Sequence, residues 1–187
     1  MKRIILPFLC LIFSLVASAQ VRKTLSFDEG WKFYKGDVPG AEASSFDDNA
    51  WRSLAVPHDW SIEGPYDRAN TTGRGGGYLP AGLGWYRKTF SVPAADAGKK
   101  TFIQFGGVMA NSDVWINGHH LGRRPNGYVA FEYELTPHLK AGKNIIAVRA
   151  DNAVQPAMRW YAGAGIYRHV RLVTTSPAYV KQYGHFV

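Results

Sequence analysis

The chain has 187 residues, a formal net charge of +8, a single cysteine and six tryptophans. Its basic residues occur singly or in pairs such as Arg123 and Arg124, so no basic run or helix indicates that the chain follows nucleic-acid phosphates. A disulfide framework is excluded by the lone cysteine, and the domain must be held together by its own apolar core.

The first 19 residues have the pattern of a secretory signal peptide. Two basic residues precede an apolar run over residues 4–16, and the small residues Ala17, Ser18 and Ala19 form a cleavage site. The run is too short to favour the alternative, a retained N-terminal membrane anchor. We therefore expect residues 1–19 to be removed, and the mature protein to be secreted or periplasmic with no membrane contact.

Before residue 99 the strand pattern is loose. Residues 25–33 and 85–92 look extended, whereas 38–49 and 62–84 are loop-like. No stretch keeps a helical period, and the 10 prolines and 20 glycines are typical of a chain with many turns.

From residue 99 onward the sequence predicts short β-strands at regular intervals. Asn117-Gly118 is a strong hairpin signal, because both central positions of a type I′ turn need positive φ. The expected strands are 101–105, 113–116, 119–121, 131–135, 144–149 and 166–174. We predict an all-β fold over residues 20–176, a jelly-roll or galactose-binding-like β-sandwich. A strand-like segment from Tyr179 has no evident partner, so residues 177–187 are expected to begin a truncated following domain.

Residues with catalytic or metal-binding chemistry do not form a recognisable set. Glu132 and Glu134 alternate with apolar neighbours on one predicted strand, so we expect them to face water. His119 and His120 are adjacent on a strand and point to opposite faces, which does not suit a shared metal. Glycines 75–77 are followed by neither Lys-Ser nor a helix, so they form no phosphate loop. We expect no cofactor and no metal.

Four segments are informative when they are taken together in order. They are 56–60 (Val-Pro-His-Asp-Trp), 84–90 (Gly-Trp-Tyr-Arg-Lys-Thr-Phe), 113–118 (Asp-Val-Trp-Ile-Asn-Gly), and 151–168, which contains Asp-Asn, Arg-Trp-Tyr and Gly-Ile-Tyr-Arg. With these segments the chain resembles the N-terminal jelly-roll domain of glycoside hydrolase family 2, and most closely its secreted bacterial β-galactosidase branch. The resemblance covers nearly all of residues 25–175.

The resemblance implies a retaining β-glycosidase whose two catalytic glutamates lie in a barrel downstream of this sequence, so the chain alone is predicted to be inactive. In the family, the first domain donates a loop to the sugar pocket just before the strand that starts at Gly165. Several members carry a substrate-contacting Asp six residues before that glycine, where this chain has Arg159. The Asn that some galactosidases use before the Gly-aromatic-Tyr segment is also unmatched, because residues 80–83 are Pro-Ala-Gly-Leu.

Five residues are predicted to contact substrate: Arg159, Trp160, Asp151, Asn152 and Asp59. Each of the polar residues among them also has an alternative, purely structural role. Asp59 is suited to accept hydrogen bonds from loop amides, and Asp151 and Asn152 to orient the 153–163 loop. Arg159 is suited to pair with Asp151 or another carboxylate at the domain interface.

Trp85 and Trp115 are expected to be core anchors rather than platforms for sugar rings.

The leading hypothesis is the sugar-binding domain of a secreted β-galactosidase-like enzyme. Its partners would be a β-galactoside-like carbohydrate and the missing downstream catalytic barrel, with no nucleic acid. The alternatives are a stand-alone carbohydrate-binding module or lectin, and a stable fragment without function.

Overall fold

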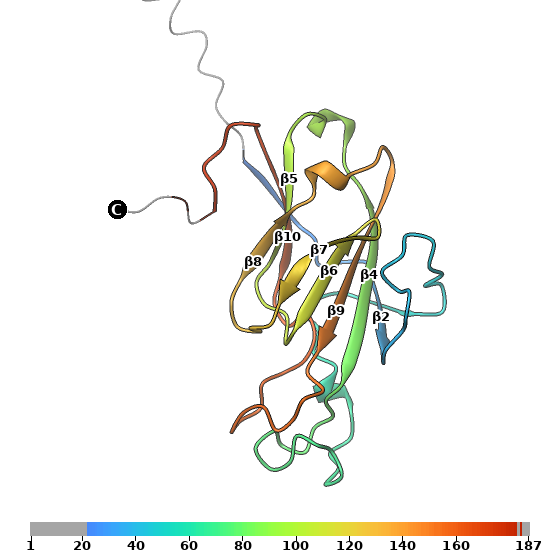
Figure 1. The fold of residues 1–187 in the computed structure, drawn as a ribbon, viewed down its shortest axis with the longest axis vertical. Coiled ribbons are helices and arrows are strands. Elements are labelled where there is room, and N and C mark those ends of the chain that lie inside the picture. Colours follow the sequence, from blue (N-terminus) through green and yellow to red (C-terminus); the bar gives the residue numbers. More distant parts are fainter. Residues whose placement is uncertain (1–21, 183, 185–187) are drawn as a thin grey trace, which may run out of the picture.

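The computed structural model describes residues 22–182 and 184 and shows a two-layer β-sandwich (Figure 1). The predicted signal peptide lies outside these residues. One sheet has four strands in the order β1-β10-β5-β8, and the other has six in the order β3-β2-β4-β9-β6-β7. All strand pairs are antiparallel, which confirms the predicted all-β sandwich. The strands are β1 (Lys23–Ser26), β2 (Trp31–Lys35), β3 (Arg52–Leu54), β4 (Leu83–Ser91), β5 (Lys100–Phe105), β6 (Ser112–Ile116), β7 (His119–Arg124), β8 (Phe131–Glu134), β9 (Lys143–Asp151) and β10 (Val170–Thr175).

Helical structure within the described part of the chain is limited to three single 3₁₀ turns, η1 (Ser61–Glu63), η2 (Ala94–Asp96) and η3 (Thr136–His138). None of these elements is long and apolar enough to cross a membrane.

The main core lies between the two sheets, where alternate residues of each strand point inward. The six-stranded sheet contributes Trp31, Tyr86 and Ile146, and the four-stranded sheet contributes Ile103 and Phe105. All five side chains are essentially inaccessible to water. Apolar burial of this extent explains how the domain folds without disulfides.

The β6–β7 hairpin turns at the predicted Asn117-Gly118 pair. Both residues have positive φ, 52° and 85°, as a type I′ turn requires. His119 and His120 follow on β7 and separate as expected: the His119 ring stacks on His138, whereas His120 contacts Asp113 at 2.9 Å.

Two strand predictions need correction, and one strand was missed. The segment 25–33 is two strands in different sheets, because the chain turns at Gly30 with φ 73°. The last strand begins only at Val170, since the backbone before it bonds to loops, with His58 N–H donating to the Ile166 carbonyl at 2.7 Å. Strand β3 was not predicted from the sequence.

A second apolar cluster covers the outer face of the six-stranded sheet. Trp85 is buried there and stacks on Trp115 with ring centroids 5.3 Å apart, beneath the loop 36–51. The prediction for Trp85 is confirmed. Trp115 is only partly buried and lies outside the main core, because β6 turns it to the outer face of its sheet.

Arg87 fastens the loop 36–51 to the same outer face. Its guanidinium is completely buried, pairs with Asp48 at 2.8 Å and donates to the carbonyl oxygens of Ala41 and Ala43. The loop is therefore held by one buried charge, which is compensated by an ion pair and by hydrogen bonds to backbone carbonyl groups.

After β10 the chain crosses the outer face of the four-stranded sheet. The Tyr179 ring packs on Phe102 at 5.2 Å, and Gln182 bonds to Gln104. Residues 179–182 and 184 contain no strand, which corrects the expected strand-like segment over these positions; residues 183 and 185–187 lie outside the described part.

Candidate functional site

Four connections meet at one end of the sandwich, drawn at the lower end of Figure 1. They are the segments 55–82, 106–111, 125–130 and 152–169. Backbone hydrogen bonds join them: Asn111 N–H donates to the Pro125 carbonyl at 3.1 Å, and Met109 and Gly165 exchange two bonds of 2.8 Å. We call this region the loop end.

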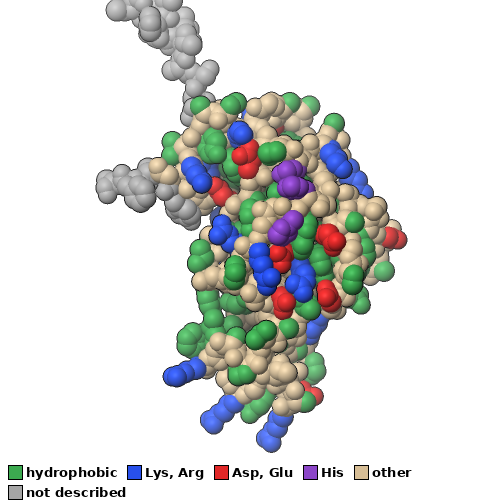
Figure 2. All heavy atoms as spheres, viewed as in Figure 1, with side chains coloured by type: hydrophobic (Ala, Val, Ile, Leu, Met, Phe, Trp, Pro, Cys, Tyr) green, Lys and Arg blue, Asp and Glu red, His purple; other side chains and the backbone are tan. Residues whose placement is uncertain are grey.

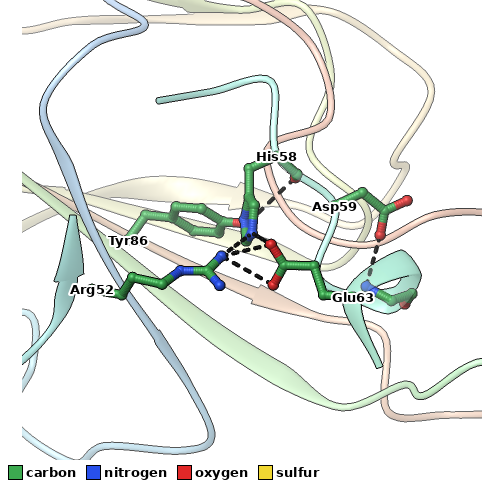
Figure 3. Close-up of polar contacts among 6 residues, drawn as sticks. Arg52, His58, Asp59, Glu63 and Tyr86 are labelled. Carbon is green, nitrogen blue, oxygen red and sulfur yellow. Dashed lines mark hydrogen bonds and ion pairs between the residues drawn. The ribbon is translucent and has the colours of Figure 1, made fainter. Parts of the chain in front are cut away.

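A polar cluster attaches the segment 55–82 to the sheet (Figure 3). His58 Nδ1 lies 2.7 Å from the Tyr86 hydroxyl on β4, and its Nε2 lies 3.1 Å from Glu63 Oε1. Arg52 on β3 reaches the same carboxylate through Nη2, 2.7 Å from Oε1 and 3.0 Å from Oε2. The first part of the segment is therefore tied to two strands of the six-stranded sheet, β3 and β4.

The ionised forms of Arg52 and Glu63 stabilise each other in this cluster. The hydrogen bond from Arg52 lowers the pKa of Glu63 and, reciprocally, Glu63 raises the pKa of Arg52. Burial lowers the pKa of His58 and raises that of Tyr86 well above its usual value. At neutral pH the imidazole is therefore uncharged, and the cluster anchors the loop.

Asp59 connects two segments of the loop end. Its Oδ1 accepts a hydrogen bond from the Ser61 backbone N–H at 2.9 Å, as predicted for a loop-holding aspartate, and its Oδ2 accepts one from the Tyr161 hydroxyl. Burial, reinforced by this carboxylate, raises the pKa of Tyr161. Asp59 thus orients the aromatic ring that lies two residues after Arg159.

Asp151 and Asn152 orient the segment that follows β9. Asn152 is buried; its Nδ2 donates to the Gly163 carbonyl at 3.0 Å, and its Oδ1 accepts from Gly82 N–H at 2.9 Å. Asp151 Oδ1 accepts from Ala153 N–H, and its Oδ2 pairs with Arg149 at 3.4 Å. Both residues therefore have the structural role expected from the sequence.

The segment 152–169 requires a glycine at position 165. Its φ is +77°, and a Cβ at this position would collide with the Tyr86 hydroxyl and with the Trp60 ring. The close approach locks the end of the loop against the buried sheet.

Arg159 and Trp160 lie on the surface of the loop end. Arg159 is exposed and has no ion pair among residues 22–182 and 184, so the expected pairing with Asp151 is not formed. Trp160 is 61% exposed, and its Nε1–H points to the Tyr128 hydroxyl at 3.4 Å. Both side chains are accessible to a ligand or a partner.

A cavity of about 390 Å³ lies between the segments 109–111, 125–128 and 152–162. Its wall is formed by Met109, Ala110, Asn111, Pro125, Asn126, Gly127, Tyr128, Asn152, Val154, Gln155, Ala157, Met158 and Ala162. Of the five predicted site residues only Asn152 belongs to this wall, while Trp160 lines a separate narrow pocket. The sequence analysis did not predict Tyr128 or Met158 as residues of the site. A signal for Tyr128 was present, because Pro125-Asn126-Gly127 is a turn sequence and the aromatic residue that follows a turn is often exposed.

The carboxylates of Asp59, Glu63 and Asp151 at this end are each engaged by neighbouring donors. Glu132 and Glu134 lie on β8, half exposed, where they contact Gln104 and Lys100 respectively. No group of three or more His, Cys, Asp or Glu side chains is placed to hold a metal ion in the described part. The loop end has the chemistry of a binding surface, with aromatic rings, amides and arginines.

Comparison with known proteins decides the family. Residues 25–176 match the family described as glycosyl hydrolases family 2, sugar binding domain. The chain belongs to glycoside hydrolase family 2. It corresponds to the family's N-terminal domain and spans 15–20% of the length of the relatives considered below.

Two curated relatives and one solved structure show how close the similarity is. A β-galactosidase of Bacteroides ovatus is 53% identical over 167 residues, which is 89% of this chain and 20% of that protein. A putative β-glucuronidase of Formosa agariphila is 48% identical over 156 residues, covering 83% and 15%. The crystal structure of a β-glycosidase from Bacteroides vulgatus superposes with a TM-score of 0.82 at 54% identity, covering 83% and 20%.

Proposed function

We propose that this family 2 domain serves a secreted or periplasmic retaining β-glycosidase that acts on β-galactoside-like substrates. In this proposal the loop end borders the substrate site of a downstream catalytic barrel, and the exposed Arg159 side chain contacts the sugar. The secretory part rests on the signal pattern of residues 1–19.

One observation carries the proposal. The segment 159–161 is exposed at the loop end, yet its base is fixed by Asp59 and Asn152. An exposed guanidinium and indole on a fixed segment suit recognition, because little backbone freedom is lost on binding. A guanidinium also offers five donors in a planar fork, which fits vicinal hydroxyl groups.

A β-glucuronide is the second candidate substrate. Arg68, Arg74 and Arg159 lie in the loop-end segments, and none of them has an ion pair within residues 22–182 and 184. Figure 2 shows Lys and Arg side chains at the lower end of the molecule, over these loops. Unpaired positive charge favours an acidic sugar, and one relative is named a putative β-glucuronidase.

The test uses the longer enzyme that carries this domain. Arg159→Ala should lower kcat/KM about tenfold or more, a loss of about 1.5–3 kcal/mol for a charged hydrogen bond, and leave Tm nearly unchanged. Arg171→Ala, an exposed arginine on β10, is the matched control and should change neither quantity. Wild-type kinetics for Arg159→Ala would remove Arg159 from the site.

Two substrates separate the candidates. Kinetics with nitrophenyl β-galactoside and nitrophenyl β-glucuronide identify the preferred sugar, and a larger Arg159→Ala effect on the glucuronide would favour the acidic substrate. The chain alone should hydrolyse neither; turnover that Glu132→Gln or Glu134→Gln abolishes would contradict its assignment as a non-catalytic domain.

A further inference from the structure

We propose that the 390 Å³ cavity at the loop end is a second carbohydrate subsite, which binds one neutral pyranose unit against Tyr128. The inference rests on the proposed sugar-binding function, and it places a ligand at residues other than those of the 159–161 segment.

The size and lining of the cavity fit a small neutral ligand. Pockets for small molecules hold roughly 300–1,000 Å³ and combine mostly apolar walls with a few placed polar groups. At about 390 Å³ this cavity is near the lower limit, and its wall contains no Asp, Glu, Lys, Arg or His. A charged ligand would lose its hydration there without a compensating partner.

Tyr128 supplies the surface that a pyranose needs. The side chain is 41% exposed, and its hydroxyl is held by two contacts, 3.0 Å to the Met158 sulfur and 3.4 Å to Trp160 Nε1. The ring is therefore oriented before any ligand arrives. A flat, partly exposed ring can pack against the C–H face of a sugar and leave the sugar hydroxyl groups available for hydrogen bonds.

Two polar side-chain atoms of the cavity wall are available to hydrogen-bond with those hydroxyl groups. In the described structure Asn126 uses only its Oδ1, which accepts from Tyr128 N–H at 2.9 Å, so its Nδ2 is an available donor. Asn111 uses its Nδ2, which donates to the Asp151 carbonyl at 3.0 Å, so its Oδ1 is an available acceptor. One free donor and one free acceptor match a pair of hydroxyl groups.

The two chain segments on either side of the cavity are held in place by hydrogen bonds within the protein. Tyr167 holds the turn through a 3.0 Å hydrogen bond from its hydroxyl to the Gly127 carbonyl. On the other side Gln155 Nε2 donates to the Asn152 carbonyl at 2.9 Å, and its Oε1 accepts from Ala157 N–H at 3.0 Å. Preformed walls reduce the entropy lost on binding.

A second cavity of similar size does not share these features. It measures about 430 Å³, and it is formed by the segments 92–101 and 136–142. Its wall contains no aromatic ring, and its Asp96 and Lys99 are paired with each other at 2.8 Å.

The test is an NMR titration of the full chain with methyl β-galactopyranoside, methyl β-glucopyranoside and methyl β-glucuronide. We expect saturable shifts at the amides of Gly127, Tyr128, Ala157 and Met158 for at least one neutral glycoside, with a Kd on the order of 1 mM for so small a ligand.

Two variants act on the cavity in different ways. Tyr128→Ala removes the ring, and Ala157→Trp fills the space without removing any contact; each should weaken binding at least tenfold. Tyr66→Ala changes an exposed tyrosine outside the cavity wall; this variant is the control and should stay within twofold of wild type.

Three results would overturn the subsite: no saturable shift, wild-type affinity in both cavity variants, or tighter binding of the glucuronide than of either neutral glycoside. None of them bears on the kinetics of Arg159→Ala, so failure here is distinguishable from failure of the proposed function.

Discussion

Asn152 allows the structural and substrate-binding roles of a predicted site residue to be separated. Its amide bridges two loop-end segments, with Nδ2 donating to the Gly163 carbonyl and Oδ1 accepting from Gly82 N–H. The side chain is buried, with 8% of its surface exposed, so water can replace its hydrogen bonds only in part. Asn152→Ala removes both bonds and leaves two backbone groups without partners.

The expected loss follows from those two groups. Each unsatisfied buried group costs about 1–3 kcal/mol, and partial access to water favours the lower half of this range, giving about 2–4 kcal/mol for Asn152→Ala. For a domain of this size each kcal/mol lowers Tm by roughly 2–4 °C, so the expected fall is roughly 4–16 °C. Asn152→Asp keeps the acceptor and loses the donor, and should lie between alanine and wild type.

Urea unfolding followed by tryptophan fluorescence measures the change. Asn49→Ala is the matched control, since Asn49 is exposed and makes only a backbone contact to Asp47; it should remain within about 0.5 kcal/mol of wild type. The reasoning fails if Asn152→Ala unfolds like wild type. If that variant also lost activity in the longer enzyme, Asn152 would be a substrate contact and not a tie between loops.

Arg87→Met should lower the free energy of unfolding by about 3–5 kcal/mol, because it breaks a buried ion pair and leaves carbonyl oxygens unpaired; a loss below about 1 kcal/mol in urea unfolding would contradict this. Burial depresses the pKa of His58 in the folded state, so the unfolded state binds the extra proton, and stability should fall as pH drops below about 6.5. His58→Gln should flatten that dependence above pH 5, and an unchanged slope would refute the assignment. Trp115→Ala should cost less than the roughly 3–5 kcal/mol of a core aromatic, and less than Trp85→Ala, because Trp115 is only partly buried; equal melting temperatures for the two variants would show that Trp115 is a core residue.

The parts of the fold that were predictable are those with strong local patterns. The Asn117-Gly118 turn and the central strands carry signals of a few residues that tertiary contacts do not override. Strand β3 was missed because three residues are too few to show alternation. Alternation also does not say how deeply a side chain is covered. Trp115 lies in the same outer cluster as Trp85 but is only partly buried there, so it is not the core anchor that was expected.

The candidate site was predictable only in part. Structural roles for Asp59 and Asn152 followed from residue chemistry next to turns. The cavity did not, because its wall joins segments separated by more than forty residues, such as Met109 and Met158. Proximity of that kind depends on how sheets stack and loops cross, and no local pattern contains it.

The first and last strands of the sandwich are hydrogen-bonded neighbours, with Lys23 opposite Thr174. The chain therefore enters and leaves the domain at adjacent points, at the pole opposite the loop end (Figure 1). Affinity tags, surface linkers or fusion partners attached at either terminus should leave the loops unobstructed, whereas insertions in the segments 55–82 or 152–169 should not be tolerated in the same way.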